Sequence, residues 1–421
     1  MKQTKLFRSL LAILFLSGIS FGANATHLVG GQITYTFTSG STYHIKLSVY
    51  RDCEGISLGS SKTIDVTNAT TGGGVTSFIV NVVNVIERTT LCPGQQSTCT
   101  NPNSIIEGVE EHIFEGDVTL PTAVEGYTLS WSENARANGV TNLVNPGSQS
   151  MYFTTFLQHN PSLQNNSPIF LNPSLPNFCI GQPATLSLNA TDADGDQIVY
   201  SLVNSRQLAG VDVNYQAGLS GTTPIVASTP VSLNSISGAI TFTPSVAGQR
   251  AVFAIRAEEF RGGIKIGEIY RDFEVRTSSC TNNTPVIAPV ANVVVAVGAT
   301  ICIPISVTDA DNDMITLSAL SGILPPGTFT INNAVAGSTT ATLCFTAGAG
   351  NAGQTYAVTL TGNDNACPAP AVATGNFTIT VPGATVPTIS EWGLIILCLI
   401  LLSIGMIFIY KKENVFSFGK N

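Results

Sequence analysis

The sequence predicts an all-β protein made of tandem β-sandwiches, with a signal peptide at the N-terminus and a transmembrane helix at the C-terminus. Short runs of alternating apolar and polar residues recur along the chain, such as "QITYTF" at 32–37, "TLSLNAT" at 185–191 and "YAVTLTG" at 356–362. Gly, Asn, Asp, Ser and Pro separate these runs, which is typical of short strands joined by turns. No long stretch between residues 26 and 382 has the periodicity of a helix.

The composition fits an exported β protein. Charged residues make up 10% of the 421 residues, compared with about 25% in an average soluble domain. Between residues 26 and 410 the chain has 25 acidic and 12 basic residues. Because an acidic surface repels phosphate backbones, this balance argues against a nucleic-acid-binding protein.

The first 25 residues predict a secretory signal peptide. Lys2, Lys5 and Arg8 precede an apolar run at 10–19, and "ANA" at 23–25 is a small-residue cleavage site. The mature chain is therefore expected to start at residue 26 and to be exported.

An internal repeat indicates the domain organisation. "NNSPIF" at 165–170 returns as "NNTPVI" at 282–287, and "TDADGD" at 191–196 returns as "TDADND" at 308–313, in both cases 117 residues later. The offset falls to about 105 by "AGQ" at 352–354, which indicates a loop insertion in the first copy. The expected divisions are a signal peptide (1–25), an N-terminal β domain (26–163), two related sandwiches (164–280 and 281–382) and a C-terminal segment with linker, sorting motif, helix and basic tail (383–421).

The cysteines predict disulfides. Eight of the nine lie outside the C-terminal apolar run, and an even number in an exported chain favours bridges in an oxidising compartment. Cys92 and Cys99 enclose one short loop and are expected to close it. Cys179 and Cys280 lie near the two ends of residues 164–280 and are expected to join them.

The remaining cysteine pairings stay open. A bridge from Cys302 to Cys344 and one from Cys344 to Cys367 are equally good ways to join strands of the second sandwich. The sequence does not indicate a partner for Cys53. A metal site is the weaker interpretation of these cysteines, because no Cys-x-x-Cys pair occurs and the chain has only 4 histidines.

Two turns carry three aspartates each at alternating positions. They are Asp192, Asp194 and Asp196 in the first copy, and Asp309, Asp311 and Asp313 in the second. Alternating residues in an extended turn can direct their carboxylates toward one cation, and Ca²⁺ prefers six to eight oxygen ligands. Glu258, Glu259 and Asp364 follow the last long strand of each copy and are candidates to complete the ligand set. The alternative interpretation is a pair of solvated turns, since Asp and Gly favour turns on their own.

A second acidic cluster, "EGVEEHIFEGD" at 107–117, is the candidate site for an enzyme. Paired carboxylates can act as general acid and base, for example in glycoside hydrolysis. A solvated edge strand explains the same residues. No nucleophile elbow and no phosphate-binding loop occurs, and the scattered histidines form no zinc motif.

The N-terminal part of the chain resembles a family of secreted Bacteroidetes proteins with cadherin-like or Ig-like domains of the gliding-motility-associated type. The motifs that carry the resemblance are "HLVGGQITY" at 27–35, "VYRDC" at 49–53, "GVEEHIFEGDVTLP" at 108–121, "WSENARANGVTNLVNP" at 131–146 and "ATDADGDQIVYSLV" at 190–203. The resemblance covers residues 26–280 and implies tandem Ig-like or cadherin-like sandwiches. Members often carry a cysteine pair after the Trp-Ser, where this chain has Asn134-Ala135. The family's usual C-terminal secretion domain is missing.

The C-terminal segment is similar to the IPTL-CTERM sorting signals, relatives of the PEP-CTERM type. The matching residues are Val386, Pro387, Thr388, Ile389, Glu391, Trp392 and Gly393. The similarity implies that an exosortase-like membrane cysteine protease reads and cuts this segment. A plain anchor explains part of the same stretch, because residues 393–410 would span about 27 Å as a helix at about 1.5 Å per residue. Lys411 and Lys412 would then stay on the cytoplasmic side.

These observations together predict a non-catalytic, exported cell-surface protein with an adhesion or matrix-type binding function. Its expected partners are the sorting protease, a surface ligand of protein or glycan type, and the membrane through the C-terminal helix. The alternatives are a polysaccharide-active enzyme with its site in residues 26–163, and a purely structural envelope component.

Overall fold

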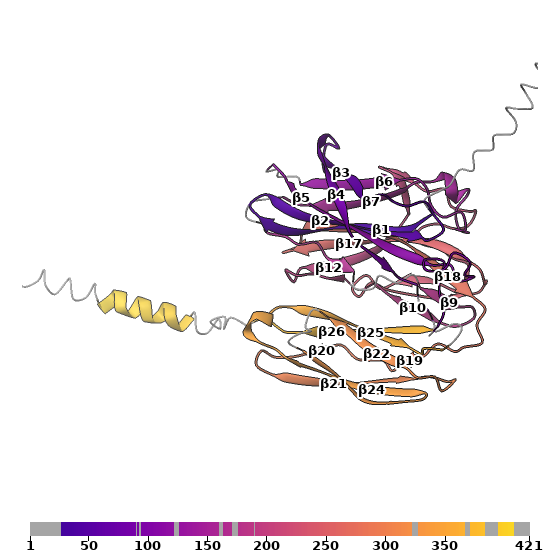
Figure 1. Cartoon of the computed structure of the whole chain (residues 1–421). Coiled ribbons are helices and arrows are strands. Elements are labelled where there is room, and N and C mark those ends of the chain that lie inside the picture. The colour runs from indigo at the N-terminus through magenta and orange to yellow at the C-terminus, as the bar shows by residue number, and fades with distance from the viewer. Residues whose placement is uncertain are drawn as a thin grey trace, which may run out of the picture.

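The structure is a computed structural model of the chain, and it describes residues 27–89, 91, 94–121, 126–159, 163–170, 176–188, 190–321, 327–366, 371–383 and 395–407. The predicted signal peptide at 1–25, the sorting motif at 386–393, Cys92 and Cys367 lie outside these ranges. Strands dominate the described residues, as Figure 1 shows, which confirms the all-β prediction.

Seven antiparallel strands form most of a first unit. They are β1 (Leu28–Ser39), β2 (Thr42–Asp52), β3 (Ser61–Asn68), β4 (Gly74–Glu87), β5 (Val109–Thr119), β6 (Tyr127–Glu133) and β7 (Met151–Leu157), with the 3-10 turn η1 (Pro146–Ser148) before β7. Their alternating apolar side chains enclose a core that contains Ile33, Tyr43, Leu129 and Phe153. Trp131 stacks on Phe153 there with ring centroids 5.4 Å apart.

A hairpin from much later in the chain closes this first unit. Its strands, β17 (Arg250–Arg261) and β18 (Ile264–Ser278), pair with each other along their length. The other edge of β18 pairs with β7 through residues 267–269 and with β1 through residues 272–273. The pairings β1-β2-β5-β4-β3-β6-β7-β18-β1 therefore form a closed ring. The predicted boundary between residues 163 and 164 thus separates strands that belong to one hydrogen-bonded sheet.

The β17–β18 hairpin is buried on both faces, because successive side chains of a strand point to opposite sides. Ala254 and Tyr270 lie in the core of the first unit. Phe253 and Phe273 lie in the core of a second unit on the other side. The hairpin is therefore a wall shared by two cores: it contributes side chains to the core of the first unit from one face and to the core of the second unit from the other.

In the second unit, a small sheet packs against the β17–β18 hairpin. Its strands are β9 (Asn177–Cys179), β10 (Ala184–Ser187), β12 (Gln197–Val203), β15 (Ala227–Leu233) and β16 (Ala239–Pro244), with the short pairs β8 (Ile169–Phe170) and β11 (Ala190–Thr191), and β13 (Arg206–Leu208) and β14 (Val211–Asp212). β12 pairs with β17 and β9 with β18, whereas β10, β16 and β15 form the facing sheet. Leu186, Ile240 and Phe242 fill the space between the two sheets.

The third unit is a sandwich of two four-stranded sheets. One sheet has the order β19 (Val286–Ile287), β21 (Thr300–Thr308), β24 (Ser338–Thr346), β23 (Thr328–Val335), and the other β20 (Val293–Val294), β26 (Val372–Thr380), β25 (Thr355–Asn363), β22 (Thr316–Ser321), with the 3-10 turn η2 (Ala349–Asn351). Its separate core includes Ile305, Leu343, Val358 and Phe377. In Figure 1 this orange unit lies beneath the second, with the sheet of β26 and β25 turned toward it. The two facing sheets therefore form a β-sandwich.

Three disulfides are described; one is the predicted Cys179–Cys280 bridge, and a second is one of the two alternatives that the sequence left open. Cys179 bonds to Cys280 with a Cα–Cα distance of 5.4 Å. Cys302 bonds to Cys344, directly opposite it in the β21–β24 register. Of the two pairings that the sequence left open for Cys344, the structure contains the one with Cys302.

The predicted Cys92–Cys99 bridge is wrong, because Cys99 bonds to Cys53 across 46 residues of sequence. The loop between β4 and β5 folds back over the end of β2, where the Cys53 amide donates to the carbonyl of Gly108 at 3.0 Å. This brings the Cα atoms of Cys53 and Cys99 to 4.9 Å. Closeness in sequence to Cys92 was therefore misleading.

Residues 395–407 form a helix. Among the described residues, no helix is both long enough and apolar enough to cross a membrane. The predicted span at 393–410 starts and ends outside the described residues.

The approach of β1 to β18 leads to a first prediction. A Cβ on Gly30 would lie 2.5 Å from the carbonyl oxygen of Asp272, so Gly30→Ala must push the two strands apart. Such overpacking typically costs about 1–3 kcal/mol. Urea unfolding should show this loss for Gly30→Ala. The matched control is Gly74→Ala, where an added Cβ meets nothing within 4 Å; an equal loss in both variants would contradict close strand contact at Gly30.

Candidate metal centres

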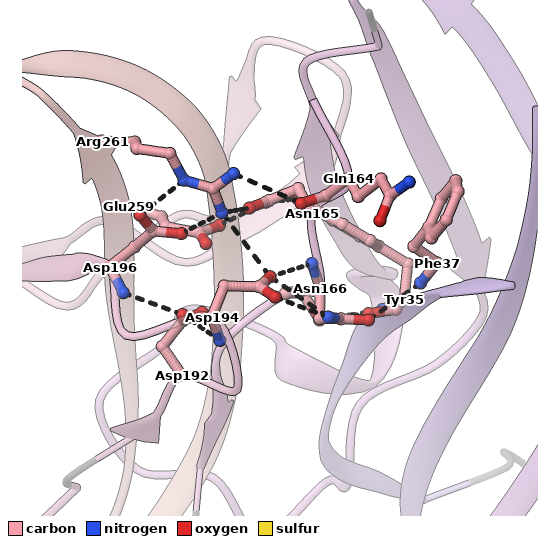
Figure 2. Close-up of polar contacts among 11 residues, drawn as sticks. Tyr35, Phe37, Gln164, Asn165, Asn166, Asp192, Asp194, Asp196, Glu259 and Arg261 are labelled. Carbon is pink, nitrogen blue, oxygen red and sulfur yellow. Dashed lines mark hydrogen bonds and ion pairs between the residues drawn. The ribbon is translucent and has the colours of Figure 1, made fainter. Parts of the chain in front are cut away.

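The first aspartate turn gathers four carboxylates. The Asp192 Oδ1 atom accepts hydrogen bonds from the amides of Asp194 and Asp196, at 2.9 and 3.0 Å. These bonds curl the turn, so that its side chains converge instead of alternating. Glu259, on the adjoining strand β17, joins them, and one carboxylate oxygen from each of the four lies within 4.8 Å of the others. Figure 2 shows the cluster.

The second turn repeats this geometry. The Asp309 Oδ1 atom accepts from the amides of Asp311 and Asp313, at 2.9 and 3.1 Å. Asp364 occupies the place of Glu259, and oxygens of Asp309, Asp313 and Asp364 lie within 4.8 Å of one another. The sequence repeat is therefore a repeat of structure. Asp311, a predicted ligand, is not part of the second cluster, because its carboxylate accepts hydrogen bonds from Asn283 instead.

A pair of asparagines at the start of each repeat forms hydrogen bonds with the acidic turn of the same repeat. The amide and the Nδ2 atom of Asn166 donate to the Asp194 carboxylate, with the amide bond at 2.7 Å. Asn283 makes the same bonds to Asp311, with the amide bond at 2.5 Å. In the sequence, "NNSP" and "NNTP" stand out only as repeats. In the structure, their second asparagines hold the acidic turns.

The first cluster lies at a junction between units. Asn165, which precedes Asn166, donates to Glu259 at 2.8 Å and to the hydroxyl oxygen of Tyr35 at 3.0 Å. Tyr35 and Phe37 belong to β1 of the first unit, and the Phe37 amide donates to the Asn166 Oδ1 atom at 2.9 Å. One asparagine pair thus links a strand of the first unit to the acidic turn of the second.

The second cluster lies at the next junction. Asn282 donates to Asp364 at 2.6 Å, and its carbonyl accepts from the Gln182 side chain of the second unit at 3.1 Å. The Gln182 Oε1 atom in turn accepts from the amide of Thr284 at 3.0 Å. The carboxylates of the third unit are therefore connected to the second unit through two residues.

Each cluster contains buried carboxylate oxygens that lack a hydrogen-bond partner. They are Oδ2 of Asp192, Oε1 of Glu259 and Oδ2 of Asp309. Glu259 is 0% exposed and Asp309 is 7% exposed. An unpartnered buried carboxylate oxygen is costly, and a cation removes that cost. By ligand type and by unsatisfied oxygen, both clusters therefore suit a positively charged partner, either a basic side chain or a hard cation such as Ca²⁺.

The carboxylates also perturb one another. Burial and the nearby charge of Asp192 raise the pKa of Glu259 to about 10. Burial, followed by the charges of Asp309 and Asp364, raises the pKa of Asp313. Both shifts reflect negative charge that is unfavourable without a positive partner.

Not every expected ligand takes part. Glu258 points away from the first cluster and pairs with Lys265 at 2.8 Å. Arg261 lies in the first cluster, where its Nε atom donates to Asp196 at 2.8 Å. Arg261 was not among the predicted site residues, although it stands only two residues after Glu259.

The acidic run at 107–117 is divided among basic partners. The pairs are Glu107 with Arg250 and Arg276, Glu110 with Arg51 and His112, Glu111 with Arg88, and Asp117 with His44. The hydrogen bond from His112, followed by that from Arg51, lowers the pKa of Glu110 to about 2. A carboxyl with so low a pKa holds no proton to donate near neutral pH, so this geometry favours structural ion pairs over an acid–base pair.

One carboxyl pair near this run behaves differently. Burial and a hydrogen bond with Glu107 raise the pKa of Asp52 to about 7. Burial opposes ionisation of Glu107 as well, but the bond from Asp52 and the charges of Arg276 and Arg250 lower its pKa to about 2. The proton of the pair therefore belongs to Asp52.

Comparisons with known proteins assign the chain to no family. No family model matches it, and no curated protein matches it. Solved structures to which it is similar include a chimeric titin Z1Z2-Z1Z2 tandem (13% identity, TM-score 0.20, 52% of this chain and 100% of that chain), domains 4 and 5 of the S-layer protein SbsC (14%, 0.17, 49% and 100%) and an endo-fucoidan hydrolase from glycoside hydrolase family 107 (13%, 0.19, 72% and 39%). At such TM-scores these likenesses carry no argument, and the fold assignment above rests on strand pairing.

The Asp52 proton leads to a pH prediction. An Asp with a raised folded-state pKa favours folding at low pH, and that contribution is lost as pH rises from about 4 to about 7. Asp52→Asn cannot lose the proton, so its stability relative to the unmodified protein should rise by about 2 kcal/mol between pH 5 and pH 8. Urea unfolding at both pH values measures this. Asp65→Asn, at an exposed position of β3, is the control, and a pH-independent difference for Asp52→Asn would show that Asp52 is ionised when folded.

Proposed function

We propose that this chain is a non-catalytic, exported cell-surface protein whose Ig-like or cadherin-like β units serve adhesion or matrix-type binding. The observation that carries the proposal is the position of the two acidic clusters. Each lies at a junction where an asparagine pair connects it to the preceding unit. A molecule that must present a surface at a fixed distance from the cell needs stiff junctions, and these clusters are where stiffness can be controlled.

Ca²⁺ is the proposed ligand of the cluster formed by Asp309, Asp313 and Asp364. Three carboxylates are half or less of the ligand set that Ca²⁺ prefers, so backbone carbonyls and water would supply the remainder. Bound Ca²⁺ would supply positive charge to a group of mutually repelling carboxylates. Since Asp364 also accepts the bond from Asn282, fixing Asp364 would fix the junction to the second unit.

Export and surface sorting form the second part of the proposal. The sequence of residues 1–25 supports export, and the three described disulfides fit an oxidising compartment. The motif at 386–393 supports recognition by an exosortase-like membrane cysteine protease, for which this chain would be the substrate. The surface ligand would be a protein or a glycan.

The calcium proposal predicts a stability effect. Ca²⁺ added to EDTA-treated protein should raise the midpoint of thermal unfolding, by an amount equivalent to about 2.7 kcal/mol at 100 times the dissociation constant. Asp313→Asn should abolish the rise, because it removes a ligand carboxylate. Asp65→Asn should keep it. Identical melting curves in Ca²⁺ and EDTA would remove calcium from the proposal, and a rise that persists in Asp313→Asn would place the ion elsewhere.

The sorting proposal predicts the size of the mature protein. Intact-mass measurement on protein isolated from the cell surface should show a chain that starts near residue 26 and lacks the residues after the 386–393 motif. A mass that still includes Lys411 and Lys412 would instead indicate a simple anchor. If a protease reads the motif, replacing Pro387 and Trp392 by Ala should prevent cleavage. The measured mass should then include the full C-terminus.

A further inference from the structure

The two acidic clusters differ in charge at one equivalent position. Arg261 stands two residues after Glu259, and Ala366 stands two residues after Asp364, so the repeat places an arginine at the first junction and an alanine at the second. The rest of each turn is matched bond for bond.

The guanidinium group of Arg261 supplies positive charge to the first cluster. Its Nε and one terminal nitrogen donate to the two oxygens of Asp196 at 2.8 and 2.5 Å, which is a bidentate pair. The same terminal nitrogen donates to the Asn165 Oδ1 atom at 2.9 Å and lies 3.7 Å from the Asp194 carboxylate. Figure 2 shows the guanidinium above the turn, between Asp196 and Asn165. Both oxygens of Asp196 are therefore already engaged by positive charge.

The second cluster has no such group. Asp313, the counterpart of Asp196, forms no ion pair among the described residues. Residues 277–410 contain no Lys, Arg or His, so the third unit has no basic side chain of its own to supply. Its four aspartates, two of them nearly buried, can be neutralised only by protons or by a cation from solution.

We infer that the two junctions use different cations: the Arg261 side chain serves the first, and only the second binds Ca²⁺. The inference rests on the proposed function, and it changes the expected number of bound ions from two to one. A Ca²⁺ ion on the free oxygens of Asp192 and Glu259 would lie beside the Arg261 guanidinium that already holds Asp196. Like charges at such distances repel strongly in a partly buried site. The first cluster therefore does not fit the cation that the sequence predicts for it.

Isothermal titration of EDTA-treated full-length protein with Ca²⁺ tests the inference through its stoichiometry. The unmodified protein should bind one ion, and Asp313→Asn should bind none. Arg261→Gln should bind two, because it frees Asp196 and removes the positive charge. Arg261→Lys keeps the charge and should bind one. Circular dichroism of each variant establishes that it is folded.

A second variant keeps the test decisive if Arg261→Gln does not fold. Asp196→Asn should leave the stoichiometry at one, since the first cluster holds no ion. Two ions on the unmodified protein, with one lost in Asp196→Asn, would overturn the inference and leave the calcium proposal standing. No ion on the unmodified protein would overturn both, and a folded Arg261→Gln that binds only one ion would show that Arg261 is not what excludes Ca²⁺.

Discussion

The shared β17–β18 hairpin is the element on which the rest of the structure depends. One of its faces contributes Ala254 and Tyr270 to the first core, and the other contributes Phe253 and Phe273 to the second. The same β18 closes the ring of the first unit by pairing with β1 and β7. Neither unit can bury its apolar residues without this hairpin, so the burial of apolar surface that stabilises one also stabilises the other.

A buried ion pair determines how the first unit docks on this wall. Asp272 of β18 and Arg136, in the loop after β6, are both 0% exposed and share two hydrogen bonds of 3.1 and 2.8 Å. Burial alone would lower the pKa of Arg136, but the charge of Asp272, its hydrogen bonds and two nearby tyrosines together outweigh burial, so the pKa is raised. Because either charge buried without the other would be strongly unfavourable, only the packing that joins them is tolerated. The pair thus specifies an arrangement more than it adds stability.

The sequence predicts the features that neighbouring residues determine, and it fails for those that distant partners determine. The turns at Asp192 and Asp309 were predictable because an Asp side chain that bonds the amides two and four residues on needs no outside partner. The stretch "YRDFEV" at 270–275 has the charges of an exposed strand, yet Asp272 and Glu274 are 0% exposed. Asp272 pairs with Arg136, which is far away in sequence, and Glu274 pairs with Arg250 across the sheet as well as with Arg276 on its own strand. Alternation along one strand carries no information on the first two partners. The Cys53–Cys99 bridge was missed for the same reason.

Arg261 escaped the sequence analysis because it breaks the repeat instead of following it. Motif comparison emphasises what two copies share, whereas the choice of cation depends on the position where they differ.

The difference between the junctions follows from how each is built. At the first junction, β18 of the shared hairpin forms backbone hydrogen bonds with β1 and β7 of the first unit. The two units are therefore joined without the side chains of the acidic turn. No strand pairing of the described residues joins the second unit to the third. Their contacts are side-chain bonds, such as Ser187 to Asn376 at 2.6 Å and Gln182 to Asn282 at 3.1 Å. An exchangeable ion at the first junction would add little to a continuous sheet. At the second, an ion bound as proposed would act where no strand pairing connects the units.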